Sequence, residues 1–217
     1  MELCIFDLDG VICDTAKYHF LAWKSLADDL GIVFTEKDNE RLKGVSRMES
    51  LEILLSLGSR SFSQEEKEKL AAEKNTRYLQ YIDQMQENEI LPGAREFIED
   101  CHNRGCWTAL GSVSKNSRRI LEKLNITGLF DYIVDGTLVT RAKPDPEVFV
   151  RSMRYFGLSP EECVVFEDAV AGIEAAHRAG MYAVGIGDRE RLPEADLVLP
   201  GFSSVTLSDV LTGLKNR

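Results

Sequence analysis

The chain has 217 residues, of which 44% are hydrophobic and 29% charged, proportions that are ordinary for a globular protein. Its formal net charge of −10 argues against a nucleic-acid-binding protein, because such proteins need a clustered basic face. No segment is apolar enough to span a bilayer, and the amino terminus lacks the pattern of a secretory signal. We therefore expect neither nucleic acid nor a membrane among its partners.

Five cysteines are an odd number and show no spacing typical of a zinc site. Buried free cysteine behaves as a small hydrophobic residue, and free thiols are typical of the reducing cytoplasm. The predicted location is therefore cytoplasmic. The cysteines are Cys4, Cys13, Cys101, Cys106 and Cys163.

The first apolar run, Leu3–Phe6, predicts a buried strand that leads directly into Asp7-Leu8-Asp9-Gly10. If the strand continued through both acids, Asp7 and Asp9 would face one site, and Gly10 would allow the chain to turn away. Paired carboxylates suit a hard cation such as Mg²⁺, and an aspartate can also act as a nucleophile in phosphoryl transfer. The alternative is an ordinary surface turn. Apolar residues on both sides favour a site at the edge of the core.

Residues 16–90 are rich in Glu, Lys, Leu and Ala and carry almost no strand signal, which predicts amphipathic helix pairs. Leu91-Pro92-Gly93 then marks the return to a different pattern. We expect a helical cap domain at 16–90, inserted into a core domain of residues 1–15 and 91–217. The alternative is that this region is one more part of a single core.

After residue 90, short β-rich runs alternate with helical stretches, which predicts an α/β fold with an open, doubly wound (Rossmann-like) parallel sheet. Ligands of such sheets bind outside the carboxyl ends of the strands, where Asp7, Ser112 and Glu167 are expected to lie. The predicted strands are Leu3–Phe6, Cys106–Leu110, Tyr132–Val134, Cys163–Phe166 and Tyr182–Ile186, and the predicted helices are Ala94–Asn103, Ser117–Leu124, Glu147–Phe156 and Val170–Ala179.

Four motifs in order resemble the signatures of the haloacid dehalogenase-like hydrolases: residues 7–15, Ser112, Lys143 with Pro144, and Glu167-Asp168. The resemblance implies that Asp7 is the nucleophile that becomes an aspartyl-phosphate and that Asp9 is the general acid/base. It implies that Ser112 binds the transferring phosphoryl group and that Lys143 offsets its charge, although an isolated lysine in a turn is more often solvated.

The same resemblance implies one Mg²⁺ as cofactor, held by Asp7, the backbone carbonyl of Asp9, and the acidic pair Glu167 and Asp168. Which acid of that pair binds the metal directly is left open. The alternative is that the pair only complements the dipole of the helix that follows it. Both roles are compatible.

A further cluster, Leu42–Ser50, resembles the β-phosphoglucomutase group of that family, together with Tyr18–Phe20 and Ala22–Lys24. Arg47 is expected to bind a second, non-reacting phosphate bidentately. Residues 114–116 are expected to form an anion site at a helix start or, alternatively, simply to cap that helix. His19 is expected to help position Asp9 or Lys74 or, alternatively, to be an ordinary residue of a helix surface. Trp23 is expected to pack in the core or at the hinge rather than to stack on a sugar. The resemblance assigns substrate binding to Thr15, His19, Trp23, Lys43, Gly44, Val45, Ser46, Arg47, Ser50, Lys74, Ser112, Val113, Ser114, Lys115 and Asn116.

The resemblance thus implies a monomeric isomerase that converts β-glucose 1-phosphate into glucose 6-phosphate through β-glucose 1,6-bisphosphate. Two alternatives remain open. One is a sugar- or polyol-phosphate phosphatase on the same fold, and the other is a catalytically silent phosphate-sensing module. The complete set of acids and Lys143 argues against the silent module.

Overall fold

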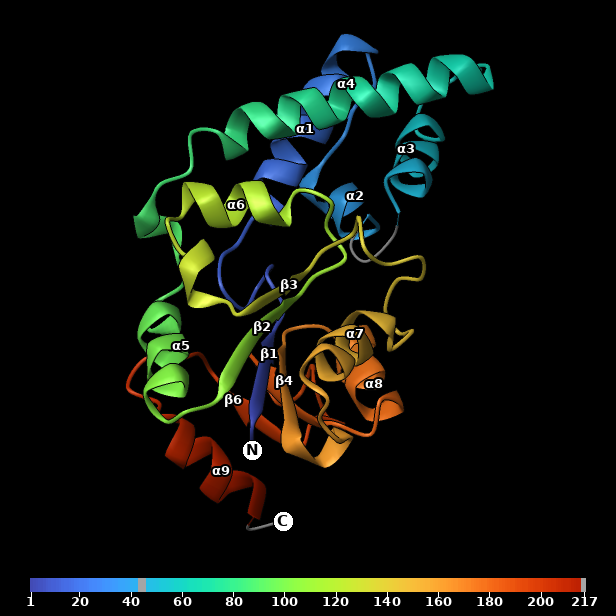
Figure 1. Ribbon diagram of the computed structural model, residues 1–217. Helices are drawn as coiled ribbons and strands as arrows, with labels where there is room; N and C mark the ends of the chain where they lie inside the picture. The colour runs from blue at the N-terminus through green and yellow to red at the C-terminus, as the bar shows by residue number, and fades with distance from the viewer. Residues whose placement is uncertain (43–45, 216–217) are drawn as a thin grey trace. The chain divides into compact units, whose positions relative to one another are not determined.

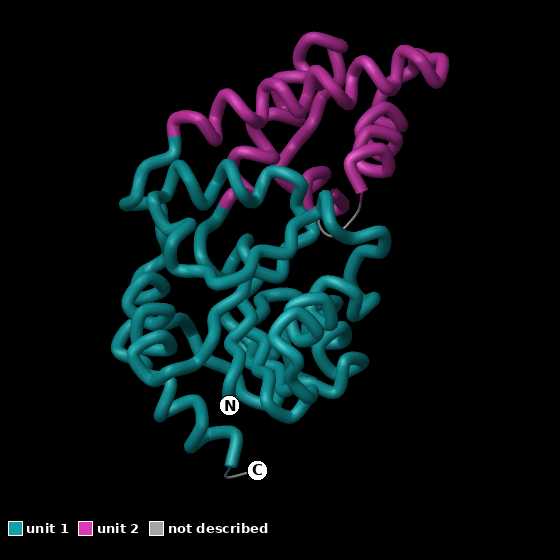
Figure 2. The backbone as a smooth tube through the Cα atoms, in the orientation of Figure 1, with its two compact units in different colours: residues 1–14, 85–217 teal, residues 15–84 magenta. Residues whose placement is uncertain are grey.

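The computed structural model describes residues 1–42 and 46–215. The chain divides into two compact units, one made of residues 1–14 and 85–217 and the other of residues 15–84 (Figure 2). The first unit is α/β, and the second is an insertion of helices. This organisation confirms the predicted fold class of a parallel sheet with a helical insertion.

The first unit is built on a six-stranded sheet in the order β3-β2-β1-β4-β5-β6 (Figure 1). Every neighbouring pair of strands is parallel. β1 lies between β2 and β4, so the residues at its carboxyl end lie beside those that follow β2 and end β4. The strands are β1 (Leu3–Phe6), β2 (Trp107–Gly111), β3 (Tyr132–Val134), β4 (Cys163–Glu167), β5 (Tyr182–Ile186) and β6 (Leu197–Leu199).

Helices cover both faces of this sheet. α7 and α8 pack on one side, and α5 and α9 pack on the other (Figure 1). The α-helices of this unit are α5 (Ala94–Asn103), α6 (Ser117–Lys123), α7 (Glu147–Phe156), α8 (Val170–Arg178) and α9 (Leu207–Lys215), and the 3₁₀ helices are η1 (Glu87–Glu89), η2 (Thr127–Leu129) and η3 (Pro160–Glu162).

Side chains of β1 alternate between two apolar layers, as a fully buried parallel strand requires. Leu3 and Ile5 pack in the layer that contains Phe149 of α7. Phe6 faces the other layer, where its ring stacks on that of Phe166 with centroids 4.8 Å apart and meets Phe97 edge-on. The strand is therefore anchored on both faces up to the residue before Asp7.

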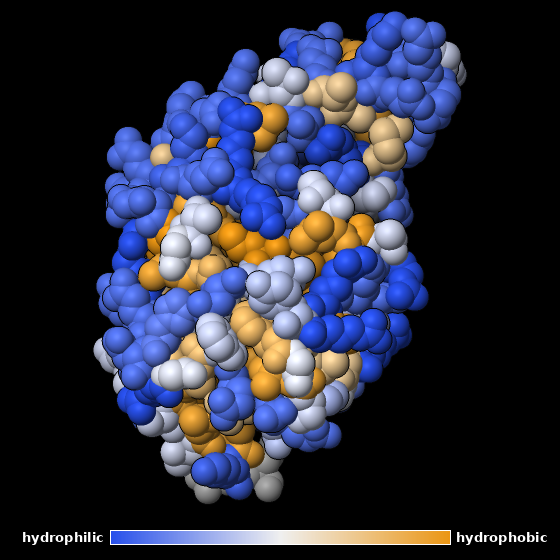
Figure 3. Space-filling model, viewed as in Figure 1, coloured by the Kyte–Doolittle hydropathy of each residue, from blue (hydrophilic) through white to orange (hydrophobic). Residues whose placement is uncertain are grey.

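The second unit consists of α1 (Ala16–Asp29), α2 (Glu36–Glu40), α3 (Arg47–Leu55) and α4 (Gln64–Ile82). α1 packs on α4, and α3 also packs on α4. Their apolar faces enclose a core that includes Trp23, Leu26 and Leu54. The outer surface of α4 is hydrophilic in Figure 3, as its charged sequence requires. This unit thus has a core made of its own residues.

Several element boundaries differ from the prediction. β2 begins at Trp107 because the N–H of Cys106 bonds the carbonyl of Cys101, 3.1 Å away, and closes α5 with Gly105 at a φ of +80°. The strand β6 and the helix α9 were not predicted. All five cysteines are free and buried, including Cys4 and Cys163, which lie in strands as expected. Among the described residues, no helix combines the length and apolar character needed to cross a membrane.

Candidate active site

Three strand ends bring the central side chains together. Asp7 directly follows β1, Ser112 directly follows β2, and Glu167 is the last residue of β4. The sheet still holds the backbone at these points: Asp7 N donates to Phe166 O and Ser112 N donates to Val134 O, each over 3.0 Å. The predicted convergence at the carboxyl edge of the sheet therefore exists in the structure.

Lys143 joins two of these carboxylates. Its Nζ lies 2.5 Å from Asp7 Oδ1 and 2.5 Å from Glu167 Oε1, and the side chain is only 9% exposed. Burial alone would lower the pKa of the ammonium, but Asp7 and Glu167 outweigh that effect and raise the pKa. The lysine is therefore a fixed positive charge within the site and not a solvated turn residue.

The acids in the site repel one another and are poorly hydrated. Burial raises the pKa of Asp7 well above its usual range, with Glu167 and Asp9 adding to the effect and Lys143 opposing it. Burial, followed by the charges of Glu167 and Asp9, raises the pKa of Asp168 to about 7. Lys143 is the positive charge that opposes both of these shifts. The cluster would be stabilised by a further cation.

The acidic cluster fits a hard divalent cation. Ligand oxygens of Asp7, Glu167 and Asp168 all lie within 4.8 Å of one another. Oxygen ligands at such spacing suit Mg²⁺, which usually takes one or two protein carboxylates and completes its shell with water or phosphate. Glu167 is already occupied on both sides, because Oε1 accepts from Lys143 and Oε2 accepts from Ala169 N at 2.9 Å.

The first strand does not continue through Asp9, so the strand geometry that would have turned Asp9 the same way as Asp7 is absent. β1 ends at Phe6, and Asp9 forms an isolated bridge with Cys13. The turn needs Gly10 for two reasons. Its φ is +76°, and a Cβ there would lie 2.1 Å from Asp168 Oδ2. The sequence indicated the turn but not this close approach of Asp168.

A second glycine makes room for an acid and was not predicted. A Cβ on Gly172, in α8, would lie 2.0 Å from Glu167 Oε1. The side chain of Glu167 thus passes over the backbone of the helix that follows it. A glycine inside an otherwise regular helix is the signal that could have indicated this contact.

Ser112 starts a compact loop that leads into α6. It is 2% exposed, and its Oγ accepts from Ser114 N at 3.2 Å, while Ser114 Oγ accepts from Asn116 N at 3.3 Å. Lys115 is exposed, and Val113 is 40% exposed. The helix cap is Asn116, whose side chain makes no capping hydrogen bond to α6.

In the helical unit, His19 contacts Lys74, which is one of the two partners predicted for it. The distance from Lys74 Nζ to His19 Nδ1 is 2.8 Å. Lys74 is 2% exposed and lies over the rings of Trp23 and Tyr78. Burial, with a contribution from Arg47, lowers its pKa to about 7. Trp23 is itself 2% exposed, which is the core packing expected for it.

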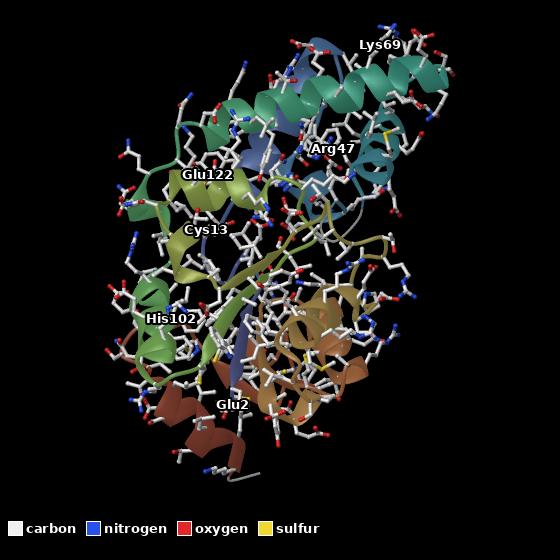
Figure 4. The ribbon with its side chains drawn as sticks, viewed as in Figure 1. Glu2, Cys13, Arg47, Lys69, His102 and Glu122 are labelled. Atoms are coloured by element: carbon white, nitrogen blue, oxygen red, sulfur yellow. The ribbon has the colours of Figure 1, made fainter. Side chains whose placement is uncertain are left out.

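The other predicted residues of this unit have local structural partners. Ser46 caps α3 by accepting from Glu49 N, and Arg47, labelled in Figure 4, donates from Nη2 to Asn75 Oδ1 at 2.7 Å. Thr15 and Ser50 are buried, and Thr15 Oγ1 accepts from the hydroxyl of Tyr78. Three predicted substrate-binding residues lie outside the described residues, namely Lys43, Gly44 and Val45.

Known proteins resemble this chain over nearly its whole length. It is 43% identical over 209 residues to a β-phosphoglucomutase of Bacillus subtilis, an alignment that covers 95% of this chain and 92% of that one. It is 34% identical to a phosphorylated carbohydrates phosphatase of Thermotoga maritima, covering 91% and 93% of the two chains.

A solved structure gives the same picture. A β-phosphoglucomutase of Clostridium difficile matches with a TM-score of 0.90 and 41% identity, covering 100% of this chain and 98% of the other. The family model of the haloacid dehalogenase-like hydrolases matches residues 1–180, which include Asp7, Ser112, Lys143 and the Glu167-Asp168 pair. The chain therefore belongs to the haloacid dehalogenase-like hydrolase family.

Proposed function

We propose that this protein is a Mg²⁺-dependent β-phosphoglucomutase that interconverts β-glucose 1-phosphate and glucose 6-phosphate. The observation that carries the proposal is the similarity, above 40% identity, to two β-phosphoglucomutases over nearly the whole chain, the helical insertion included. The acidic site with its buried lysine supplies the chemistry that such an enzyme needs.

In the first transfer of the proposed reaction, the 6-hydroxyl of β-glucose 1-phosphate attacks phospho-Asp7, and the bond from phosphorus to the Asp7 oxygen breaks while Asp9 accepts the proton of the hydroxyl. In the second transfer, the Asp7 carboxylate forms a bond to the phosphorus at the 1-position, and Asp9 returns the proton to the departing sugar oxygen. Lys143 balances negative charge at Asp7, which it already contacts. The hydroxyl of Ser112 binds the phosphoryl group. β-Glucose 1,6-bisphosphate is the intermediate that reorients between the two transfers.

We assign the metal to Asp7 and Asp168 as direct carboxylate ligands, with the carbonyl of Asp9. Both oxygens of Glu167 already accept hydrogen bonds, so we place Glu167 outside the direct ligands. When bound, Mg²⁺ would reduce the repulsion between Asp7 and the anionic phosphoryl group.

We assign recognition of the second phosphate to Arg47, because a guanidinium binds phosphate bidentately. A hydrogen bond to a charged group contributes roughly 1.5–3 kcal/mol. Arg47→Ala should therefore weaken bisphosphate-dependent turnover by on the order of tenfold to a few hundredfold. Hydrolysis of acetyl phosphate, which carries one phosphate, should be nearly unchanged.

The decisive test is a coupled assay of glucose 6-phosphate formation from β-glucose 1-phosphate, with Mg²⁺ and a trace of the bisphosphate. Lys69→Ala is the control for Arg47→Ala, since Lys69 is an exposed cation of the same unit that pairs with Glu65 (Figure 4). Asp7→Asn should abolish both turnover and phosphoenzyme. Turnover in the Asp7→Asn variant would show that Asp7 is not the nucleophile.

A sugar-phosphate phosphatase is the second candidate, favoured by the 34% identity to the Thermotoga maritima enzyme. The two functions differ in where the phosphoryl group goes. Phosphate release that outpaces glucose 6-phosphate formation at every bisphosphate concentration, together with an Arg47→Ala variant as active as the parent, would establish the phosphatase.

A further inference from the structure

The turn that follows β3, Asp135–Thr137, lies directly against the Ser112–Asn116 loop (the Ser112 loop). Gly136 N donates to Ser114 O over 3.0 Å. A Cβ on Gly136 would lie 2.1 Å from Val113 O and 2.9 Å from Lys115 N. The φ of Gly136 is not in the left-handed region, so the close approach, and not the backbone conformation, is what requires glycine here.

The same turn carries a buried carboxylate. Asp135 is 1% exposed, and its Oδ1 accepts from the N and Oγ1 of Thr137 at 2.9 and 2.5 Å. Its Oδ2 accepts from Arg118 Nε at 2.9 Å, and Arg118 Nη2 also donates to Ile133 O at 3.1 Å. Arg118, which lies on α6, therefore links that helix to the turn and to β3 by two hydrogen bonds.

Arg118 belongs to the first turn of α6, the helix that begins immediately after the Ser112 loop and on which Glu122 is labelled in Figure 4. The loop is therefore flanked by Asp135, which follows β3, and by its ion-pair partner Arg118, which lies in α6. A buried carboxylate beside a phosphate-binding loop repels an incoming phosphate unless a cation compensates it. Arg118 is half-exposed, yet it is the ion-pair partner of this carboxylate.

We propose that Arg118 and Gly136 are positioning residues for phosphate binding by the Ser112–Asn116 loop. Arg118 neutralises Asp135, and Gly136 allows the turn to approach Val113 O closely while its N–H holds the Ser114 carbonyl by a hydrogen bond. The inference rests on the function proposed above, because it takes the loop as the phosphoryl-binding element. Neither residue is proposed to touch the substrate.

The charge is tested with Arg118→Gln and the double variant Arg118→Gln/Asp135→Asn. Calorimetry with inorganic phosphate and Mg²⁺ should give a Kd raised on the order of tenfold in Arg118→Gln. The double variant should return to within about threefold of the parent, since an asparagine can still accept from Thr137. Arg119→Gln, which removes the same charge from the next position, is the matched control.

The close approach is tested with Gly136→Ala against Gly128→Ala. A Cβ at Gly128 would meet nothing within 4 Å, and its φ is also outside the left-handed region, so this control should resemble the parent. Gly136→Ala should raise the KM for β-glucose 1-phosphate about tenfold or more, with the Mg²⁺ requirement unchanged. The metal readout separates displacement of the loop from general damage to the site.

Equal phosphate affinities in the parent and Arg118→Gln would overturn the proposal. An equally weak double variant would also overturn it, because the loss could then not come from the charge of Asp135. Phosphate binding is measured without turnover, so these outcomes remain distinct from a failure of the mutase function. If the parent forms no glucose 6-phosphate but Arg118→Gln still loses phosphate affinity, only the proposed function fails.

Discussion

Replacing Gly10 by alanine should weaken metal binding without unfolding the protein. The new Cβ would lie 2.1 Å from Asp168 Oδ2, whereas ordinary van der Waals contact begins at 3.4 Å, so the carboxylate must move by more than 1 Å. Metal–ligand distances tolerate only about ±0.2 Å. The displaced Asp168 would therefore no longer serve as a ligand.

Two effects of this substitution have to be separated. The φ of +76° strains any residue with a Cβ, at a cost of about 1–2 kcal/mol. Gly105→Ala provides the matched control, because its φ is +80° and a Cβ there would meet nothing within 4 Å. Both variants should lose similar stability, but only Gly10→Ala should require more metal, by on the order of 10–100-fold as for a disturbed ligand shell.

The assay is a Mg²⁺ titration of acetyl phosphate hydrolysis, supported by calorimetric metal binding to each folded variant. Chemical denaturation gives the two stabilities for comparison. Half-saturation at the same Mg²⁺ concentration in Gly10→Ala and Gly105→Ala would refute the reasoning, because the collision with Asp168 would then have no consequence for the metal.

Three further changes have defined outcomes. Ser152 Oγ is buried without a hydrogen-bond partner among the described residues, so Ser152→Ala should stabilise the protein by about 1 kcal/mol, and an unchanged or lower denaturation midpoint would contradict this. Burial, assisted by Lys74 and Arg47, lowers the pKa of His19 from 6.5 to about 3. The folded protein therefore binds a proton at His19 less readily than the unfolded chain does. The contribution of His19 to the free energy of unfolding is complete above pH 6.5 and should decrease toward pH 3, by up to about 1.4 kcal/mol per pH unit. His19→Asn should flatten that profile in denaturant titrations at several pH values, and a slope equal to that of the parent would exclude His19 as the cause. Lys143→Met leaves Asp7 and Glu167 buried without their cation and should lower the free energy of unfolding of the metal-free protein by about 3–5 kcal/mol. The double variant Lys143→Met/Glu167→Gln should regain part of that stability, and no gain would contradict the pairing.

Much of the fold was predictable because local patterns and topology agree. The helices Ala94–Asn103 and Glu147–Phe156 have strong amphipathic periodicity, and their bounds match the structure. β6 has three residues, all only partly buried, so it carries too little apolar signal to be recognised. α9 packs beside α5, and its place depends on that tertiary contact.

The site was predictable only in part. Residues at strand ends follow from the parallel topology, which is why Asp7, Ser112 and Glu167 could be grouped in advance. Contacts between distant segments leave no comparable trace in the sequence. The close approach of Gly10 to Asp168 depends on how separate loops cross, as does the ion pair between Arg118 and Asp135.

The insertion has a consequence for the order in which the chain can fold during synthesis. β1 is made before the other described strands, but Leu3 pairs with Trp107 of β2 and with Cys163 of β4. The helical unit, residues 15–84, has its own core and is complete before either partner strand exists. We expect the helical unit to fold first, while β1 remains unpaired and prone to aggregation until β2 has been synthesised. Slowing translation beyond residue 84 should therefore lengthen the period in which the nascent chain depends on chaperones.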